Sequence, residues 1–238
     1  MTETIQLGEV SIAVTRKDIK NVHLSVHPPH GRVTLSAPRA TRLEVARAYA
    51  ISKLGWIREQ QKKLADQARE TPRQFINRES HSLWGRRHLM TVAHRDAKPF
   101  VALDHKRIIL TVRPGSNAAK RAEVIHEWHK ALLHEQVPKL ISKWERKLKV
   151  EVRGYFLQRM KTKWGSCNHR AGHIRLNTEL VKKPKDLLEY VIVHEMTHLI
   201  APTHSGRFIA ILQKHYPTWR EARAELNELP LTAEVWNE

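Results

Sequence analysis

The sequence is poor in the residues that mark several large protein classes. Cys167 is the single cysteine among 238 residues, so no disulfide can form within the chain, and a reducing compartment is expected. No apolar run approaches the roughly 18 residues of a membrane-spanning helix. The first residues lack the basic and apolar regions of a signal peptide. We therefore expect a cytoplasmic protein without membrane contact.

Acidic residues are also scarce relative to basic ones. The chain has 42 Lys and Arg against 24 Asp and Glu, which gives a formal net charge of +18. Such a charge favours polyanionic partners, namely nucleic acid, a nucleotide, an anionic protein or a protein bound to nucleic acid. A solvated basic surface explains the charge equally well, because charge alone does not fix a function. The oligomeric state is left open by the sequence.

The spacing of hydrophobic residues, which make up 41% of the chain, predicts an α+β protein. In residues 1–115, alternating stretches such as VSIAV, NVHLSVH and RVTLSAP predict a β-rich N-terminal region that also contains a helix. Thr41 and Glu44 have the spacing of a capping box, so this helix is expected to begin at Thr41 and to run to about Ala68. No internal repeat is visible in the sequence.

Residues 116–238 are expected to form a second region, made of helices and a short sheet. A long helix is predicted from about Asn117 to Leu148, with Pro138 bending or splitting it. Strands are expected in VRGYFLQRMKTKWGSC and GHIRLN, followed by the helix KDLLEYVIVHEMTHLI and two further helices. The alternative is that residues 1–115 and 116–238 form one compact unit.

The stretch HEMTHLIAPTH, residues 194–204, is the strongest functional signal. His194 and His198 lie one turn apart on one face of a helix, so both imidazoles can reach one metal ion. Zinc accepts three protein nitrogens and keeps one position for water. Glu195, beside the pair, is placed to take a proton from that water. The alternative is a pair of buried, hydrogen-bonded histidines in a core helix.

A third ligand is expected from the residues that follow the helix. Pro202 cannot continue a helix, so the chain should fold back and bring His204 to the ion. Glu221 or Glu225 on the last predicted helix is the alternative third ligand. The spacing is that of three-histidine zincins, but Ala201 stands where metzincins have a glycine.

Several segments resemble a known family. RMKTKWGSC, GHIRLN and EYVIVHEMTHLIAPTHSGRF are similar to the YgjP-like metallopeptidase-domain proteins, which are related to the SprT-like and WLM zinc peptidases. NVHLSVHPPHGRVTLSAPR, LGWIREQQKKL and LWGRRHLMTV resemble the same family's N-terminal region, so the resemblance covers nearly the whole chain. It implies that His194, His198 and His204 bind one zinc ion and that Glu195 is the general base. Phe208 also matches the pattern and is expected to pack under the site.

RMKTKWGSC and HIRLN supply the candidate substrate-binding residues, which are Lys161, Lys163, Trp164, Ser166, Arg175 and Asn177. Trp164 and Ser166 are expected to face the cleft, with a lysine near enough to hold an oxyanion or a phosphate. HIRLN is expected to run beside the cleft, where an extended peptide could pair with it. The alternative is that Trp164 and Gly165 shape a turn and a core contact, with Cys167 buried as a small hydrophobe.

Together these features predict that residues 116–238 form a zincin-like metal-binding hydrolase core. The protein is thus expected to be a zinc-dependent hydrolase, most simply a metallopeptidase in which Glu195 activates a water molecule. One alternative keeps the metal but hydrolyses a nucleotide's phosphoanhydride bond. The lack of a glycine-rich phosphate loop counts against it. Another alternative is a nucleic-acid-associated binding protein with a vestigial metal site. Glu195 counts against that one, since a structural site has no use for a general base.

Overall fold

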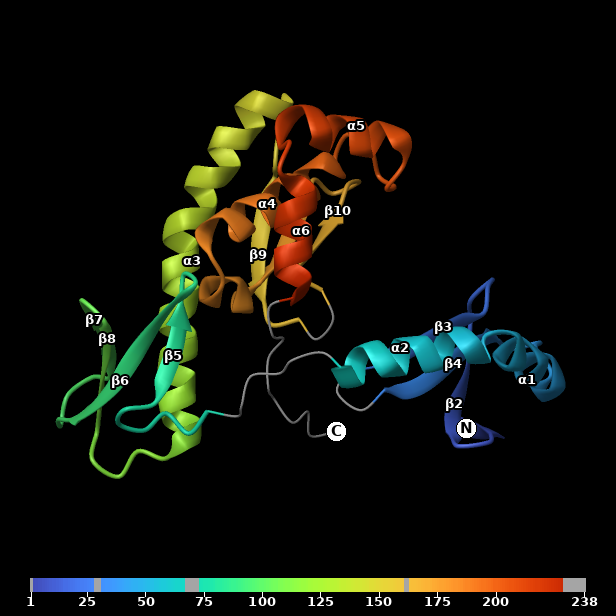
Figure 1. Cartoon of the computed structure of the whole chain (residues 1–238), viewed down its shortest axis with the longest axis horizontal. Helices are drawn as coiled ribbons and strands as arrows, with labels where there is room; N and C mark the ends of the chain where they lie inside the picture. Colours follow the sequence, from blue (N-terminus) through green and yellow to red (C-terminus); the bar gives the residue numbers. More distant parts are fainter. Residues whose placement is uncertain (1, 28–30, 67–72, 161–162, 229–238) are drawn as a thin grey trace. The chain divides into compact units, whose positions relative to one another are not determined.

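The computed structural model describes residues 2–27, 31–66, 73–160 and 163–228 (Figure 1). Its helices and mixed sheets confirm the expected α+β class. The chain divides into two compact units, with the division at residues 70 and 71. The expected division at 115/116 therefore falls inside the second unit. None of the helices in the described part of the chain is long and apolar enough to cross a membrane.

The first unit is a four-stranded sheet with two helices. Its elements are β1 (Thr2–Leu7), β2 (Val10–Lys17), β3 (His23–His27), β4 (Arg32–Pro38), α1 (Leu43–Ser52) and α2 (Leu54–Asp66). The strand order is β1-β2-β4-β3, with β2 and β4 parallel and the other pairs antiparallel. Alternate residues such as Ile12 and Leu35 are fully buried against Ala50 and Ile57 of the helices, and this packing forms the core of the unit.

The predicted capping box at Thr41 does not form. The backbone N–H of Thr41 donates to the carbonyl of Pro38 at 3.0 Å, so Thr41 belongs to the turn after β4. The N-cap residue of α1 is Arg42, and its side chain makes no capping hydrogen bond. The turn at the end of the strand therefore delays the helix by one residue and takes Thr41 out of the capping position.

The single helix expected up to about Ala68 is two helices. At Lys53 the backbone leaves the helical conformation, with φ −106° and ψ 5°, and α2 then begins at Leu54. Gly55 lies in the first turn of α2, and glycine disfavours a continuous helix by roughly 1 kcal/mol relative to alanine. Ala68 itself lies outside the described residues.

The second unit contains two sheets and four α-helices among its described residues. Its elements are β5 (Ser80–Leu83), β6 (Arg86–His94), β7 (Phe100–Asp104), β8 (Arg107–Val112), α3 (Ala118–Leu148), β9 (Gly154–Gln158), β10 (Gly165–Asn168), β11 (His173–Asn177), the 3-10 helix η1 (Thr178–Lys182), α4 (Lys185–Thr197), α5 (Gly206–His215) and α6 (Trp219–Glu228). The strand orders are β5-β6-β8-β7 and β10-β11-β9.

The sheet β5–β8 repeats the plan of the sheet in the first unit. In both sheets a hairpin comes first, its second strand then pairs in parallel with the fourth strand, and the third strand pairs antiparallel with the fourth. A helix follows the fourth strand in both cases. No repeat was expected, because strand order and direction recur here without a shared residue pattern.

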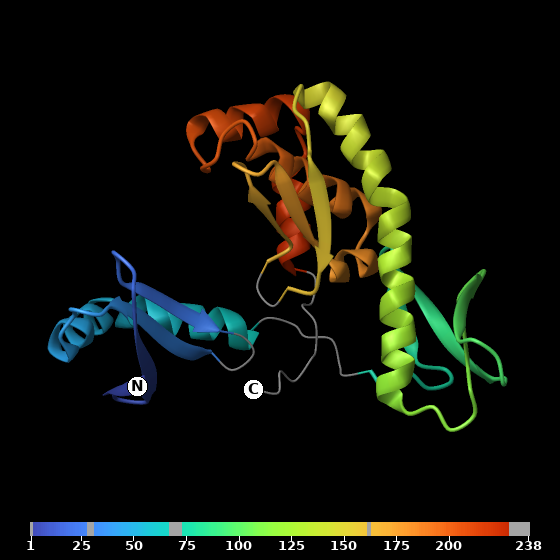
Figure 2. The same cartoon turned by 180° about the vertical axis from the view of Figure 1, so that it is seen from behind.

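The long helix α3 joins the two halves of the second unit. Asn117 caps it as predicted, and the Asn117 side chain accepts a hydrogen bond from the backbone of Lys120 at 2.9 Å. The helix continues through Pro138 and curves over its second half (Figure 2). Ile125 packs into the core of β6 and β8, whereas Leu133 and the later buried residues pack into the core that contains α4. Because one helix completes both cores, a division at 115/116 would leave both incomplete.

The sheet β9–β11 has one covered face. Ile174 and Leu176 of its central strand β11 are fully buried together with Leu188 and Ile192 of α4. Side chains of a strand alternate between its two faces. This alternation decides which candidate residues approach α4 and which point away from it.

Candidate metal centre

The helix α4 positions the first two histidines. It ends at Thr197, and His198 is its C-cap residue, still in helical conformation with φ −64° and ψ −19°. His198 therefore stays one turn after His194, and the centres of their rings are 5.1 Å apart. Most of α4 is buried, so the pair is held rigidly by the core.

A tight turn brings His204 back to the same place. The backbone N–H of Leu199 donates to Met196, and the N–H groups of Ile200 and Ala201 donate to Thr197. The chain has therefore left the helix before Pro202, and His204 returns until its Nε2 lies 3.1 Å from Nε2 of His194. The expected return of the chain is present, although it starts earlier than the proline.

The three imidazoles form one cluster. A ligand nitrogen from each of His194, His198 and His204 lies within 4.8 Å of the other two, and no other such group of His, Cys, Asp or Glu occurs among the described residues. Neither Glu221 nor Glu225 belongs to the cluster. Phe208, which is 2% exposed, contacts all three rings with centroid distances of 4.6 to 5.0 Å. It packs under the cluster as expected.

The donor set fits a zinc ion. Burial, and then the charges of His198 and His204, lower the pKa of His194 to about 3, and burial also lowers the pKa of His198. Both imidazoles are thus neutral at pH 7, as metal ligands must be. Two nitrogens bound tetrahedrally at the usual zinc distances are about 3.3 Å apart, close to the 3.1 Å observed between His194 and His204. Nδ1 of His198 lies 3.3 Å from the carbonyl oxygen of Ala201, which leaves Nε2 for an ion.

Glu195 is buried against strand β10. Its side chain is 5% exposed, and a Cβ built on Gly165 would lie 2.5 Å from the Glu195 Oε1. Burial raises the pKa of Glu195 to about 8, and the charge of Lys163 opposes this shift. The glycine of KWGSC therefore makes room for the carboxylate. A turn at Gly165 was the alternative offered by the sequence, whereas the structure places this glycine in a strand, where glycine can indicate a close approach of this kind.

The pleat of β10 places Ser166 away from the metal centre. Gly165 pairs with Leu176 and Cys167 pairs with Ile174, so these two residues share the covered face with Glu195. Ser166 pairs with Arg175 on the opposite face. The expectation that Ser166 faces the site is wrong, because neighbouring residues of a strand point to opposite faces. Cys167 packs against the core, and burial followed by the charge of Glu195 raises its pKa to about 11.

The strand β11 cannot accept a peptide at its edge. It pairs with β10 on one side and with β9 on the other, so its backbone groups are already used. The expectation that HIRLN pairs with an extended substrate is therefore corrected, and β10 is the edge strand on this side of the sheet. Arg175 points to the uncovered face, where its guanidinium lies 5.7 Å from the centre of the Phe156 ring.

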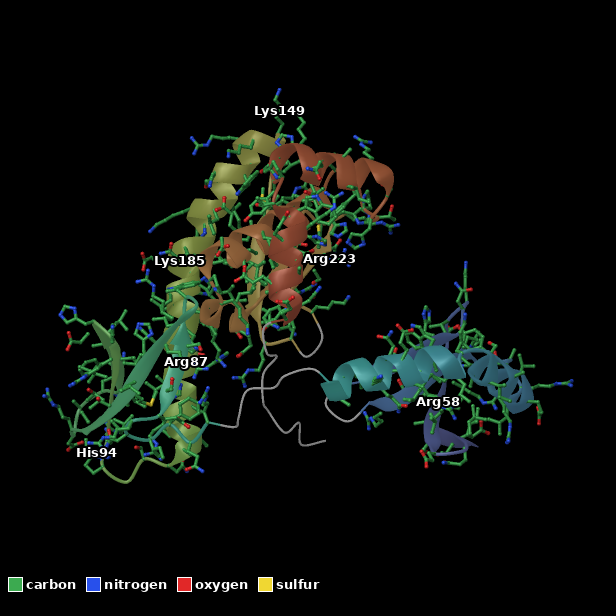
Figure 3. All side chains as sticks on the ribbon, in the orientation of Figure 1. Arg58, Arg87, His94, Lys149, Lys185 and Arg223 are labelled. Carbon is green, nitrogen blue, oxygen red and sulfur yellow. The ribbon has the colours of Figure 1, made fainter. Side chains whose placement is uncertain are left out.

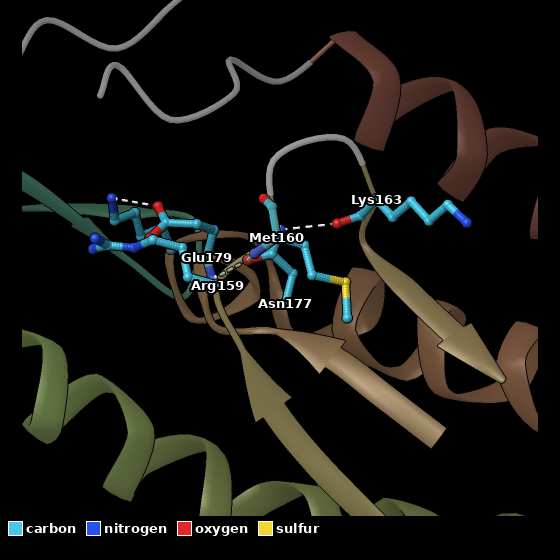
Figure 4. A network of polar contacts seen from close by, with 6 residues as sticks. Arg159, Met160, Lys163, Asn177 and Glu179 are labelled. Atoms are coloured by element: carbon cyan, nitrogen blue, oxygen red, sulfur yellow. Dashed lines mark hydrogen bonds and ion pairs between the residues drawn. The ribbon is translucent and has the colours of Figure 1, made fainter. Parts of the chain in front are cut away.

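Asn177 is a buried structural residue (Figure 4). Its Nδ2 donates to the carbonyls of Met160 at 3.0 Å and Lys163 at 2.8 Å. Its Oδ1 accepts from the backbone N–H groups of Met160 at 3.4 Å and Glu179 at 3.1 Å. These four contacts occupy the whole amide, so Asn177 joins the two ends of segment 160–163 and has no polar group left for a substrate.

The other candidates lie in three different situations. Lys161 lies outside the described residues. Trp164 packs against the core, and Nζ of Lys183 lies 5.4 Å from the centre of its ring. Lys163 is exposed and close enough to Glu195 to act on its pKa. Sequence reasoning also missed Glu179, whose buried carboxylate forms ion pairs with Lys182 at 2.6 Å and Arg159 at 3.8 Å.

Comparison with known proteins finds a partial likeness to solved structures and a match to the model of one protein family. The metallopeptidase zymogen of Pyrococcus abyssi abylysin is 21% identical and matches 38% of this chain and 90% of its own, with a TM-score of 0.36. The zymogen of Methanocaldococcus jannaschii jannalysin is 22% identical and matches 38% of this chain and 92% of its own, with a TM-score of 0.35. No curated protein matches the chain. The family model of the YgjP-like metallopeptidase domain matches residues 20–229, and because this match spans most of the sequence, the chain belongs to the YgjP-like metallopeptidase family.

Proposed function

We propose that the protein is a zinc-dependent peptidase whose single metal site is formed by His194, His198 and His204. The observation that carries this proposal is the convergence of three imidazole nitrogens next to a buried carboxylate, in a chain with a metallopeptidase domain. A hydrogen-bonded core pair of histidines would not require the third imidazole to return from beyond the helix to within 3.1 Å of the first.

The proposed roles follow from the placement of each side chain. The three imidazoles would hold a zinc ion, which would supply Lewis acidity to polarise a peptide carbonyl and to make a water molecule more acidic. Glu195 accepts a proton from the attacking water and then delivers it to the nitrogen of the leaving amine. Glu195 is suited to this because its carboxyl group is held against Gly165 and lies outside the three-histidine cluster. The positive charge of a bound zinc ion would favour the ionised carboxylate that a general base requires.

We place the substrate along β10 instead of β11. The strand β10 is paired on one side only, and it carries Gly165 directly beside the proposed general base. An extended peptide added to this edge would form backbone hydrogen bonds that hold its scissile bond near Glu195. Lys163, which precedes the strand and acts electrostatically on Glu195, supplies a cation for the developing oxyanion.

The test compares the zinc-loaded wild-type protein with Glu195→Gln. Both are incubated with unfolded casein-like proteins, DNA-bound proteins and nucleoside triphosphates, and peptide and phosphate products are measured. We expect peptide products from the wild type alone, with equal zinc in both proteins. Phosphate release that depends on Glu195, without peptide cleavage, would replace the peptidase assignment by nucleotide hydrolysis. Equal cleavage by both proteins would remove Glu195 as the base.

A further inference from the structure

We propose that the outer face of the sheet β9–β11 binds single-stranded nucleic acid, with Phe156 as the platform on which a base stacks. This surface lies on the side of the sheet opposite α4, so the inference goes beyond the proposed peptidase activity. It concerns only the described residues of the second unit.

The outer face is open within its unit. Figure 2 shows this face turned toward the reader, with α4 and α6 behind the sheet and α3 beside it. The register places Phe156 of β9, Arg175 of β11 and Ser166 of β10 next to one another on this face. Ile174 and Leu176, their neighbours along β11, are fully buried on the other face. The strand pleat therefore separates a covered apolar face from a polar face with a single large aromatic ring.

Phe156 has the surroundings of a stacking residue. Its side chain is 48% exposed, although it lies in the middle of a regular strand. The guanidinium of Arg175 lies 5.7 Å from its ring centre, and the ring of His173 meets it edge-on at 5.4 Å and 78°. Aromatic rings on a sheet bind single-stranded nucleic acid by stacking on its bases, and neighbouring arginines add cation–π and phosphate contacts.

The segment that forms most of this sheet is basic in sequence, which favours a polyanion as its partner. Residues 149–175 contain seven Lys and Arg but one acidic residue, Glu151. The stem of Arg153 lies against the backbone of Gly172, next to His173, where a Cβ would be 3.1 Å from its Cγ. Arg153 is exposed at this end of the sheet and Arg175 lies in the middle of it. The face thus offers one cation beside the exposed ring and a second at the end of the sheet, and a phosphate backbone that passes over the face can contact both.

Two other occupants fit the surface less well. An acidic peptide would use the cations but would give no reason for an exposed phenyl ring in a charged setting. A second copy of this chain would bring the same basic face against itself, because a two-fold interface pairs a patch with its own copy. A nucleic acid strand uses the ring and the cations together.

The experiment measures fluorescence anisotropy of a labelled single-stranded DNA of about 12 nucleotides, titrated with the full chain at several salt concentrations. The test variants are Phe156→Leu and Arg175→Gln. The matched controls lie on the other sheet of the same unit: Phe100→Leu, where the phenyl is also 48% exposed, and Arg87→Gln on β6 (Figure 3). Thermal melting checks that each variant is folded.

We expect Phe156→Leu to weaken binding by roughly 5- to 100-fold, which corresponds to the loss of one stacked base. Arg175→Gln should reduce the slope of log affinity against log salt by about 0.7, because one phosphate contact is lost. Both controls should bind as the wild type does. Glu195→Gln should also bind normally, so a failed peptidase assay leaves this result unaffected.

Three results would overturn the proposal. The first is DNA affinity and salt slope unchanged in both Phe156→Leu and Arg175→Gln. The second is an equal loss of DNA affinity in Phe100→Leu, which would show that the effect is not specific to the ring of Phe156. The third is a preference for polyglutamate over DNA that depends on Arg175 and not on Phe156, which would identify an acidic protein as the partner. If Phe156→Leu is unfolded, Arg175→Gln and its salt slope decide the question.

Discussion

The backbone of Gly165 lies against the carboxylate of Glu195 so closely that a methyl group on Gly165 would be 2.5 Å from Oε1 and 2.7 Å from Cγ. The strand β10 and the helix α4 can therefore lie this close only because Gly165 has no side chain. This contact links the two motifs of the sequence, KWGSC and the histidine helix, into one site. It also leaves little space between the proposed base and the edge of the sheet where we place the substrate.

Gly165→Ala should displace Glu195 and abolish most of the peptidase activity while zinc remains bound. The added methyl meets the carboxylate, and overpacking of this kind costs about 1–3 kcal/mol. Activity, zinc content and melting temperature are measured on the same preparation. The control is Gly55→Ala, because a Cβ there meets nothing within 4 Å. Wild-type activity in Gly165→Ala would show that the contact does not position the base.

Asn177→Asp should lower the melting temperature of the protein by several degrees. The substitution replaces the two N–H donors by an oxygen that faces the carbonyls of Met160 and Lys163, and unsatisfied buried groups cost about 1–3 kcal/mol each. The control is Asn168→Asp, since Oδ1 of Asn168 accepts from the backbone of Ala171 at 3.1 Å and an aspartate can do the same. Equal melting temperatures of the two variants would contradict the clamp assigned to Asn177.

The buried His129 should make the second unit sensitive to acid. Burial, and then the charge of Lys182, lower the pKa of His129 from 6.5 to about 3, while Glu179 opposes the shift and His126 and His81 add to it. Between these two values the unfolded chain binds more protons than the folded protein. The free energy of unfolding should therefore fall as the pH drops from about 6.5 toward 3, by up to about 1.4 kcal/mol per pH unit.

The measurement is denaturant unfolding at several pH values from about pH 4 to about pH 7, which covers most of the interval between the folded and unfolded pKa values of His129. His129→Leu should show a shallower loss of stability in acid than the wild type. His94→Leu, which removes an exposed histidine of β6 (Figure 3), serves as the comparison. If His129→Leu and the wild type lose stability in parallel, the acid sensitivity does not come from this imidazole.

The sequence predicts those parts of the site that depend on local geometry. Helical spacing places His194 and His198 on one face. An end of the helix before His204 can be expected from Pro202, which cannot continue a helix. The three imidazoles meet accordingly. The boundaries of α3 were predictable for the same reason, since its N-cap residue and its apolar stripe are local signals.

The parts that depend on strand register were not predictable. A shift of one residue exchanges the two faces of a strand, so Ser166 was expected on the wrong face of the sheet. Asn177 was expected at the substrate because HIRLN was expected to run beside the cleft, yet three of its four hydrogen bonds join it to Met160 and Lys163, which lie 17 and 14 residues away in the sequence. The repeated strand plan was not predictable either, because the direction of strand pairing produces no recognisable residue pattern in a single sequence.

The most direct test of the three-histidine site is the zinc-to-protein ratio of the purified chain, determined by elemental analysis after dialysis against a metal-free buffer. We expect about one zinc per chain in the wild type and in Glu221→Gln and Glu225→Gln, which remove the two alternative third ligands. His194→Ala and His204→Ala should lose the metal. A full zinc complement in His204→Ala together with loss of zinc in Glu221→Gln or Glu225→Gln would assign the third ligand to α6 and contradict the site described above.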